Sequence, residues 1–491
     1  METFLIKAAQ LILALVILVT VHEFGHYIFA RIFGMRVDRF YLFFNPWFSI
    51  AKYDPRKGTV QLVAWTKKTR ENNDKDAPVI ETPKSLFTFK VGKPHPADPN
   101  AKPTWRDTIY GLGWLPLGGY CSIAGMIDET TDADKLSAEP QPWEFRAKKP
   151  WPRLMVMIAG VLLNFILAII IYIGIAWHWG DKVIQFSSAT EGLDYVEQLQ
   201  KAGFKDGDIP LTVDGQSIDV KKDKVIWDMV QDGAEITVLR NHKDTISFTI
   251  PQGTLASLSN LDEKGMMDYR YPVIVKQISP GEGAAHSDLS AGDYILKVNN
   301  DTIPSFSEFG PTLAKYKGND VTVTFRRNNK VHTTKCHINN DGKIGIMASS
   351  PAEIYPVEIV EYSFLESIPK GVSDGVDKLT MYVSSLKMLF TKQGAESVGG
   401  FGAIGDLYPN QWNWYAFWNI TAFLSVILAF MNILPIPALD GGHVLFTLWE
   451  IITRRKPSEK FLEYAQMAGM AFLFLLLIYA NGNDIYRFFF K

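Results

Sequence analysis

A His-Glu-Phe-Gly-His pentad, from His22 to His26, follows directly on an apolar run over residues 4–21. On a helix, side chains four residues apart lie on one face, so both histidines can bind one Zn²⁺ ion. Glu23 lies beside them, where its carboxylate can polarise a metal-bound water. The pattern therefore predicts metal-assisted peptide hydrolysis at the end of a membrane helix. A structural role is the alternative, but ionisable groups inside a membrane helix are costly and need partners.

Four segments are apolar and long enough to cross a bilayer. They cover residues 4–33, 154–179, 414–434 and 461–479. The fourth carries Glu463 and Gln466 near its start, so a peripheral helix is the alternative for it. The first is not expected to be a signal peptide, because it lacks a strongly basic start and a small-residue cleavage site before His22.

Positive charge in the connections predicts how these spans are oriented. Cytoplasmic loops carry an excess of Lys and Arg, so the first and third connections are expected in the cytoplasm. The N-terminus, the large segment between spans two and three and the C-terminus then face the periplasm of a bacterial inner membrane. The charges in question are Arg31, Arg36, Arg39, Arg146, Lys148, Lys149, Arg153, Arg454, Arg455 and Lys456.

The overall charge and the cysteine content exclude two further classes of protein. A formal net charge of −2 gives no sign of a nucleic-acid partner. The chain has two cysteines, too few for a disulfide framework. The predicted orientation puts Cys121 and Cys336 on opposite sides of the membrane, so both are expected to be unpaired.

The large external segment contains an internal repeat. Gly207-Asp208 and the residues up to Ile218 recur 85 positions later as Gly292-Asp293 and the residues up to Ile303. Each copy has the pattern of a turn, a strand, a turn and a strand, and resembles a PDZ domain of the circularly arranged bacterial kind. Such domains bind extended peptides by strand addition. A β-domain that serves only as a spacer is the alternative, more so for the first copy, in which Pro210 interrupts the strand.

The first cytoplasmic loop combines strand-like and irregular stretches. Residues 58–65 and 115–123 alternate like short strands, which predicts a small β-sheet near the metal helix. An edge of that sheet could hold a substrate extended for attack. Between them, residues 67–103 are basic, rich in proline and without periodicity, and are expected to form an insertion or mobile loop to which no chemistry is assigned.

A third metal ligand is predicted at the inner end of the third span. Residues 432–442 place Asp440 between two helix-breaking prolines and a diglycine. Irregular backbone at membrane depth is tolerated where protein or water satisfies it. A buried carboxylate without a cationic partner in the sequence is explained by metal coordination, with water in the fourth position. An ordinary turn at a helix end is the alternative.

Together, these motifs resemble the site-two protease family of intramembrane zinc metalloproteases, and within it the branch of the regulator of sigma E protease. The resemblance covers nearly the whole chain. It rests on the pentad at 22–26, the Leu-Asp-Gly-Gly core of the 432–442 motif, the paired PDZ-like repeats and Pro-Leu-Gly-Gly-Tyr at 116–120. It implies Zn²⁺ as the cofactor, held by His22, His26 and Asp440, and Glu23 as the general base.

The resemblance also implies two substrate-binding residues. Asn432 is expected to help hold an unwound substrate, with a helix-kink residue as the alternative. Asn164 is expected to contact the substrate or to support the metal site, with a polar residue of helix packing as the alternative. The motif around Asn164 departs from the family, because Gly160-Val161 stands where members typically carry Gly-Pro.

The implied function is regulated cleavage of single-span membrane proteins, such as anti-sigma factors or remnant signal peptides. An upstream site-one-type protease would first trim their outer domains. The PDZ-like domains would act as a size filter, with peptide tethering as the rival role. The partners are therefore substrate membrane segments and the lipid bilayer. A membrane-anchored PDZ scaffold with a structural metal site, or a zinc carrier, is the alternative, but either would leave Glu23 without a role.

The expected fold is a multi-span α-helical membrane protein with about four membrane helices, a small cytoplasmic membrane-associated β-sheet and two periplasmic PDZ-like α/β domains. The spans are expected at 1–34, 151–180, 412–437 and 461–480, and the PDZ-like domains at 181–270 and 271–350. The remaining parts are the cytoplasmic loops at 35–150 and 438–460, a helical region with a glycine-rich flexible lead at 351–411 and a tail at 481–491.

Overall fold

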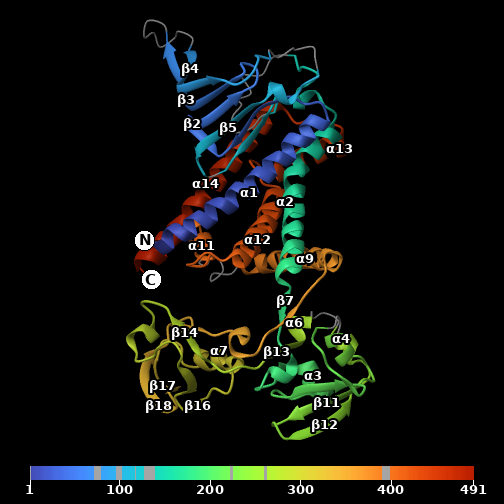
Figure 1. Ribbon diagram of the computed structural model, residues 1–491, viewed down its shortest axis with the longest axis vertical. Coiled ribbons are helices and arrows are strands. Elements are labelled where there is room, and N and C mark those ends of the chain that lie inside the picture. The colour runs from blue at the N-terminus through green and yellow to red at the C-terminus, as the bar shows by residue number, and fades with distance from the viewer. Residues whose placement is uncertain are drawn as a thin grey trace. The chain divides into compact units, whose positions relative to one another are not determined.

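The computed structural model describes residues 2–70, 79–95, 102–116, 118–126, 139–221, 225–258, 263–389 and 399–490. The chain divides into two compact units (Figure 1). Met1–His178 and Tyr362–Phe490 form the first, which we call the membrane unit. Trp179–Glu361 form the second, which we call the two-lobed unit.

The membrane unit contains four described helices that are long and apolar enough to cross a bilayer, as predicted. They are α1 (Glu2–Ile32), α2 (Pro150–Trp179), α12 (Trp414–Ile433) and α14 (Glu459–Phe490). The tail predicted at 481–491 is wrong for residues up to Phe490, because α14 continues through them. An apolar run marks the length of a span, and polar residues can continue the same helix beyond it.

Local sequence explains where these helices begin and end. α1 is followed by Gly34 in the left-handed conformation, and Met35 N donates to Ala30 O across the turn. α12 begins after Asn413, whose side chain accepts a hydrogen bond from Ala416 N. It ends just before the two prolines of the 432–442 motif, after which α13 (Asp440–Thr453) begins.

A six-stranded sheet follows α1, where a small sheet is predicted. Its strand order is β4-β3-β2-β5-β1-β6, with β1 and β5 parallel and the other pairs antiparallel. β6 therefore forms one edge of the sheet. The strands are β1 (Val37–Leu42), β2 (Phe44–Asp54), β3 (Thr59–Arg70), β4 (Val79–Lys90), β5 (Ile109–Leu115) and β6 (Tyr120–Ile123).

The irregular loop predicted at 67–103 is wrong for much of its length. β3 continues to Arg70, and β4 pairs with it from Thr59↔Lys90 to Arg70↔Val79. Leu86 and Phe87 are both exposed, so the outer strand lacks the alternation of buried and exposed residues that identifies a strand in sequence. Residues 71–78 and 96–101 of this stretch lie outside the described residues.

The glycine-rich flexible lead predicted in the 351–411 region is wrong where residues Phe401–Asp406 form helix α11, whose start is fixed by Asp484 of α14. The Asp484 carboxylate accepts hydrogen bonds from the backbone N–H groups of Gly400 and Ala403. The helical part of the same region is present as α9 (Phe364–Leu389), which packs on α2 through Gly371.

Among the described residues of the two-lobed unit, the two largest hydrophobic clusters lie within residues 186–269 and 273–348, which we call the first and second lobes. Each lobe contains a four-stranded sheet, β10-β9-β11-β12 in the first and β16-β15-β17-β18 in the second. The strands are β9 (Ile209–Val213), β10 (Gln216–Ser217), β11 (Glu235–Arg240), β12 (Asp244–Thr249), β15 (Tyr294–Val298), β16 (Asp301–Thr302), β17 (Asp320–Arg327) and β18 (Lys330–His337). Pro210 lies within β9 and does not interrupt it.

The repeat has a physical basis in one buried ion pair per lobe. Asp208 accepts two hydrogen bonds from Arg240, and Asp293 accepts two from Arg327. Both aspartates are almost fully buried, so each needs a bidentate partner to offset its lost hydration. The Gly-Asp pair of the repeat thus fixes the start of equivalent strands.

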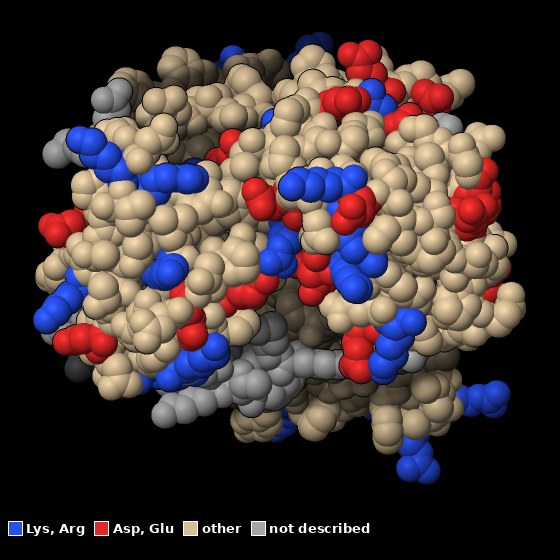
Figure 2. Space-filling view, turned by 90° about the horizontal axis from the view of Figure 1, so that it is seen from below, with Lys and Arg blue, Asp and Glu red and all other residues tan. Residues whose placement is uncertain are grey.

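Two sequence expectations concern the surface and the thiols. Cys121 and Cys336, the two cysteines of the chain, form no disulfide bond, as predicted. On the face seen in Figure 2, Lys and Arg side chains alternate with Asp and Glu, and neither sign forms a continuous field. This surface agrees with the small net charge of −2.

Candidate metal centre and active site

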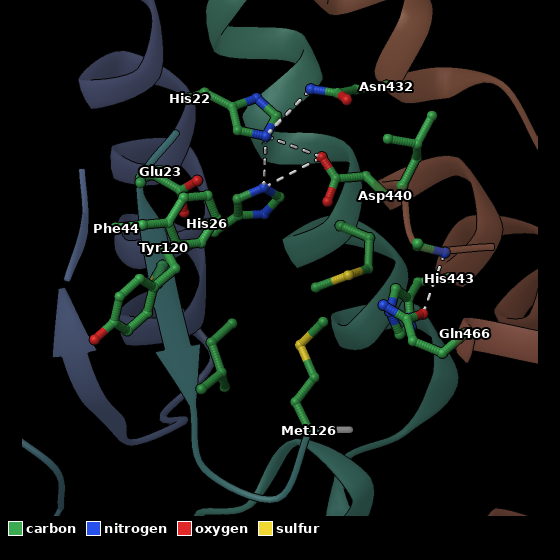
Figure 3. Close-up of a pocket in the computed structure, with 16 residues that line it drawn as sticks. His22, Glu23, His26, Phe44, Tyr120, Met126, Asn432, Asp440, His443 and Gln466 are labelled. Atoms are coloured by element: carbon green, nitrogen blue, oxygen red, sulfur yellow. Dashed lines mark hydrogen bonds and ion pairs between the residues drawn. The ribbon is translucent and has the colours of Figure 1, made fainter. Parts of the chain in front are cut away.

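Helix α1 brings His22 and His26 onto one face, as the four-residue spacing predicts. Their Nε2 atoms are 3.3 Å apart, and the rings meet edge to face with centroids 4.8 Å apart. Both side chains are buried. The two imidazoles therefore point toward one small volume inside the membrane unit (Figure 3).

Asp440 reaches the same volume as the first residue of α13. Its Oδ2 lies 3.2 Å from Nε2 of His22 and 3.3 Å from Nε2 of His26. The diglycine makes this approach possible, because a Cβ at Gly441 would lie 2.0 Å from Leu434 O and one at Gly442 would lie 2.7 Å from Ile436 O. Only glycine permits α13 to start so close to the end of α12.

These three ligand atoms fit a zinc ion. A tetrahedral ion with bonds of about 2.0–2.1 Å separates its ligands by about 3.3 Å, and the three distances here are 3.2–3.3 Å. Asp440 Oδ2 is buried and makes no hydrogen bond to any described residue, as expected for an atom whose partner is a metal. Two imidazoles and one carboxylate form a common donor set of catalytic zinc sites.

The chain also controls which histidine nitrogen faces the ion. Nδ1 of His26 donates to the backbone O of Val156 in α2 at 2.8 Å, which leaves the Nε2 lone pair for a metal. Asn164 of α2 lies against the other ligand, with its Nδ2 3.3 Å from Nδ1 of His22. The sequence predicts substrate binding or metal support for Asn164, and the structure brings it to the metal ligand, fully buried.

The orientation of the Asn164 amide decides what it does. With Nδ2 toward His22, the Asn164 Oδ1 is buried and has no hydrogen-bond partner among the described residues. The two atoms of an amide are distinguished only by their hydrogen bonds. With Oδ1 toward His22, the amide accepts the Nδ1–H and again frees the Nε2 lone pair. We therefore infer that Asn164 holds His22 in its metal-binding tautomer.

Close contact between α1 and α2 depends on two glycines. A Cβ at Gly25 would lie 2.5 Å from Ala159 O, and one at Gly160 would lie 2.5 Å from Nε2 of His26. Any side chain at Gly160 would therefore occupy the space of the ligand atoms. Val161 stands where members of the resembling family typically carry proline. This difference leaves the contact intact, because Gly160 is retained.

Glu23 lines a pocket of about 190 Å³ together with the three ligands. Its carboxylate faces the backbone N–H of Cys121 in β6, the edge strand of the sheet. Asn432, in the last turn of α12, also lines the pocket, and its Nδ2 lies 3.4 Å from Nε2 of His22. The pocket thus brings together a carboxylate, an amide, an edge strand and three residues that could hold a metal ion, His22, His26 and Asp440.

Gln466 of α14 is a residue that sequence reasoning noticed only as an oddity in an apolar span. It is buried, and its Oε1 accepts a hydrogen bond from Ala438 N at 3.2 Å (Figure 3). Ala438 has a positive φ of 82°, which is unfavourable for a residue with a Cβ. α14 therefore fixes the strained backbone two residues before Asp440. A polar side chain in an apolar run is the signal that points to such a contact.

Comparison with known proteins agrees with this geometry. The profile of peptidase family M50 matches residues 10–64 and 98–476. The chain is 24% identical to the regulator of sigma E protease of Haemophilus influenzae, over 99% of this chain and all of that protein. It is 23% identical to zinc metalloprotease Rip1 of Mycolicibacterium smegmatis, over 90% of this chain and 84% of that one. A solved PDZ domain from Listeria monocytogenes is 25% identical over 16% of this chain, with a TM-score of 0.15.

We expect Asn164→Leu to weaken zinc binding about 10-fold to 100-fold, because His22 loses the group that fixes its tautomer. Asn164→Asp keeps an acceptor and should bind zinc nearly as well as the wild type. Competition with a chromophoric chelator measures the zinc affinity of both variants. Asn419→Leu is the matched control, since Asn419 bonds only within its own helix α12. Unchanged zinc affinity in Asn164→Leu would show that this amide has no such role.

We expect Gln466→Leu to weaken zinc binding about tenfold, because an unsatisfied buried N–H costs about 1–3 kcal/mol. Ala438→Gly removes the penalty on positive φ and should recover part of that loss in the double variant. The zinc affinities of the wild type, both single variants and the double variant together form a double-mutant cycle. Strictly additive effects would mean that the two residues do not act on the same turn.

Proposed function

Because the chain belongs to peptidase family M50, the site-two protease family, and is an intramembrane zinc metalloprotease, we propose that it cleaves single-span membrane proteins at membrane depth. We propose that His22, His26 and Asp440 hold the zinc. The observation that carries this proposal is the triangle of ligand atoms, 3.2–3.3 Å on each side, beside Glu23 in a buried pocket. When bound, zinc supplies a water of lowered pKa and polarises the peptide carbonyl.

Glu23 is proposed as the general base and acid. Its carboxylate takes the proton of the attacking water and then gives that proton to the amine nitrogen of the cleaved bond. Its contact with the backbone of Cys121 supports this role, because the carboxylate then lies between the metal ligands and the strand edge where a substrate would lie. Asn432 is proposed to donate its amide N–H to the substrate carbonyl nearby.

The free edge of β6 is proposed to hold the substrate in an extended conformation. A helical segment is a poor substrate, because its carbonyl groups are bonded within the helix. Strand addition would replace those bonds with bonds to β6. The position of Gly119 supports this, since a Cβ there would lie 3.4 Å from Cγ of Glu23. The strand edge and the carboxylate are thus close enough to share one substrate.

The substrate class follows from the relatives and from the predicted orientation. One relative is named regulator of sigma E protease, so anti-sigma factors are proposed as substrates here, with remnant signal peptides as a second group. The active site is proposed to open toward the cytoplasm of a bacterial inner membrane, on the side of the positive connections. The lobes would then lie in the periplasm as PDZ-like domains and reject substrates until an upstream protease has trimmed them.

A membrane-anchored scaffold with a structural metal site is the alternative function. A structural zinc site is usually closed by four protein ligands. Within the described residues, the metal-binding group contains three, His22, His26 and Asp440, and it borders an open pocket. An open fourth position favours catalysis.

We expect Glu23→Gln to retain zinc and to lower cleavage of a single-span reporter by about 10²–10⁴-fold, because the water loses its base. Asp440→Ala should lose zinc itself. Purified protein in lipid, assayed for cleavage and bound zinc on the same samples, measures both. Glu463→Gln is the matched control, because it changes a carboxylate of the membrane unit that lies outside the pocket. Turnover by Glu23→Gln, or full zinc in Asp440→Ala, would contradict the assigned roles.

We expect removal of the lobes to permit cleavage of untrimmed substrates. β7 (Asp181–Val183) pairs with β20 (Glu358–Val360), so the chain enters and leaves the two-lobed unit at adjacent points, and residues 184–357 can be replaced by a short linker. Cleavage of reporters with and without an outer domain measures the effect, with Glu23→Gln in the same deletion as the control. Weaker cleavage of the trimmed reporter would favour peptide tethering over a size filter.

A further inference from the structure

A second cavity, of about 430 Å³, lies on one face of the six-stranded sheet and is larger than the metal pocket. Two cations, Arg39 and Lys52, line it. Gln61 adds an amide, and Trp47 and Trp65 add aromatic surface. None of the described residues that line this cavity is Asp or Glu. The cavity is therefore electropositive and partly aromatic.

A glycine in β5 leaves room for the ring of Tyr41, which lines the cavity. Gly111 pairs with Tyr41 of β1 on one side and with Lys52 of β2 on the other. A Cβ at Gly111 would lie 2.2 Å from Cε1 of Tyr41, so the ring covers the glycine. Because no side chain rises between them, Tyr41 and Lys52 face the same space.

The two cations lack a counterion. Neither Arg39 nor Lys52 forms an ion pair with a carboxylate in the described part of the chain, and Asp54, near Lys52, pairs with Arg56. Burial lowers the pKa of Lys52, and although Asp54 opposes that shift, the charge of Arg39 adds to it. Two neighbouring positive charges with no paired carboxylate favour binding of an anion.

Since α1 is long and apolar enough to span a bilayer, we infer that the cavity lies near the bilayer boundary. A Cβ at Gly119 would touch Val19 of α1, and the next residue, Tyr120, pairs with Tyr41 at the level of Lys52. Val19 is about 20 Å along the helix from its last residue, Ile32. Cations at such depth are stable only when paired or in a wet cavity, and lipid phosphate is the anion at hand.

The part of the cavity around Lys52 lies beyond the reach of a substrate side chain. A peptide added to β6 would be separated from β2 by β6, β1 and β5. Four strand spacings of about 4.8 Å amount to about 19 Å, whereas Arg39 and Tyr41 of β1 line the near side of the cavity at two spacings. Trp47, which is 82% exposed, adds the aromatic surface that is enriched at membrane interfaces.

We propose that this cavity binds the phosphate of an anionic phospholipid. Arg39 and Lys52 hold the phosphate oxygens, with the Gln61 amide as a further donor. Trp47 and Trp65 contact the glycerol and the first acyl carbons. Headgroups with a net negative charge are preferred, because the cavity offers no carboxylate to an ammonium group. The site is independent of the peptidase reaction and anchors the sheet beside the metal pocket.

Native mass spectrometry of the full chain in detergent tests this site, with dioctanoyl phosphatidylglycerol, dioctanoyl phosphatidylcholine and inorganic phosphate as separate probes. We expect the wild type to prefer phosphatidylglycerol, and Lys52→Gln and Arg39→Gln each to weaken it about tenfold. Lys52→Arg keeps the charge and should retain binding. Lys57→Gln is the matched control, an exposed lysine on the next turn outside the cavity. Bound zinc reports that each variant is folded.

Three results would overturn the proposal. An equal loss in Lys57→Gln would mean that the lipid is held by general charge attraction. Inorganic phosphate that displaces phosphatidylglycerol at similar concentration would make this a site for free anions. Binding of an acidic peptide that depends on Lys52, while lipid binding does not, would assign the cavity to a protein ligand.

Discussion

The packing of the membrane unit depends on one constraint. Two imidazoles and one carboxylate must lie within 3.3 Å of each other among apolar helices. Apolar surroundings make each of these groups costly unless it is paired. Close packing of α2 on α1 excludes water, and it is possible only because Gly25 and Gly160 carry no side chain. The ligand geometry and the helix packing are therefore one constraint.

Every membrane helix contributes to meeting that constraint. α1 supplies the histidines, and α2 orients them through Val156 O and Asn164. α12 ends where the carboxylate loop must begin, and α14 supports the loop through Gln466. Backbone held at positive φ costs about 1–3 kcal/mol and persists only where its surroundings fix it. The strained turn before Asp440 is such a place.

The sequence predicted the parts that local rules govern and missed those that depend on distant contacts. The four spans, the shared face of His22 and His26 and the strand pairs of the repeat follow from periodicity and spacing. Asp440 stood out because a charge at membrane depth needs a partner. β1, β2 and all of β5 except Leu115 were missed, since their residues alternate poorly in burial. The role of Gln466 was missed because its partner, Ala438, lies in the turn between α12 and α13, distant in sequence.

The edge strand explains how a helical substrate could be attacked inside a bilayer. Unwinding a helix there frees backbone groups, each of which costs several kcal/mol when no partner replaces the helix bond. β6 is an edge strand, and the N–H of Cys121 faces Glu23, so the edge of the sheet borders the metal pocket. Bonds to that edge would offset the cost, and Gly119, directly before β6, lies close enough to α1 that a Cβ there would meet Val19 and Glu23. The proposed chemistry therefore needs the edge strand beside the metal ligands as well as the ligands themselves.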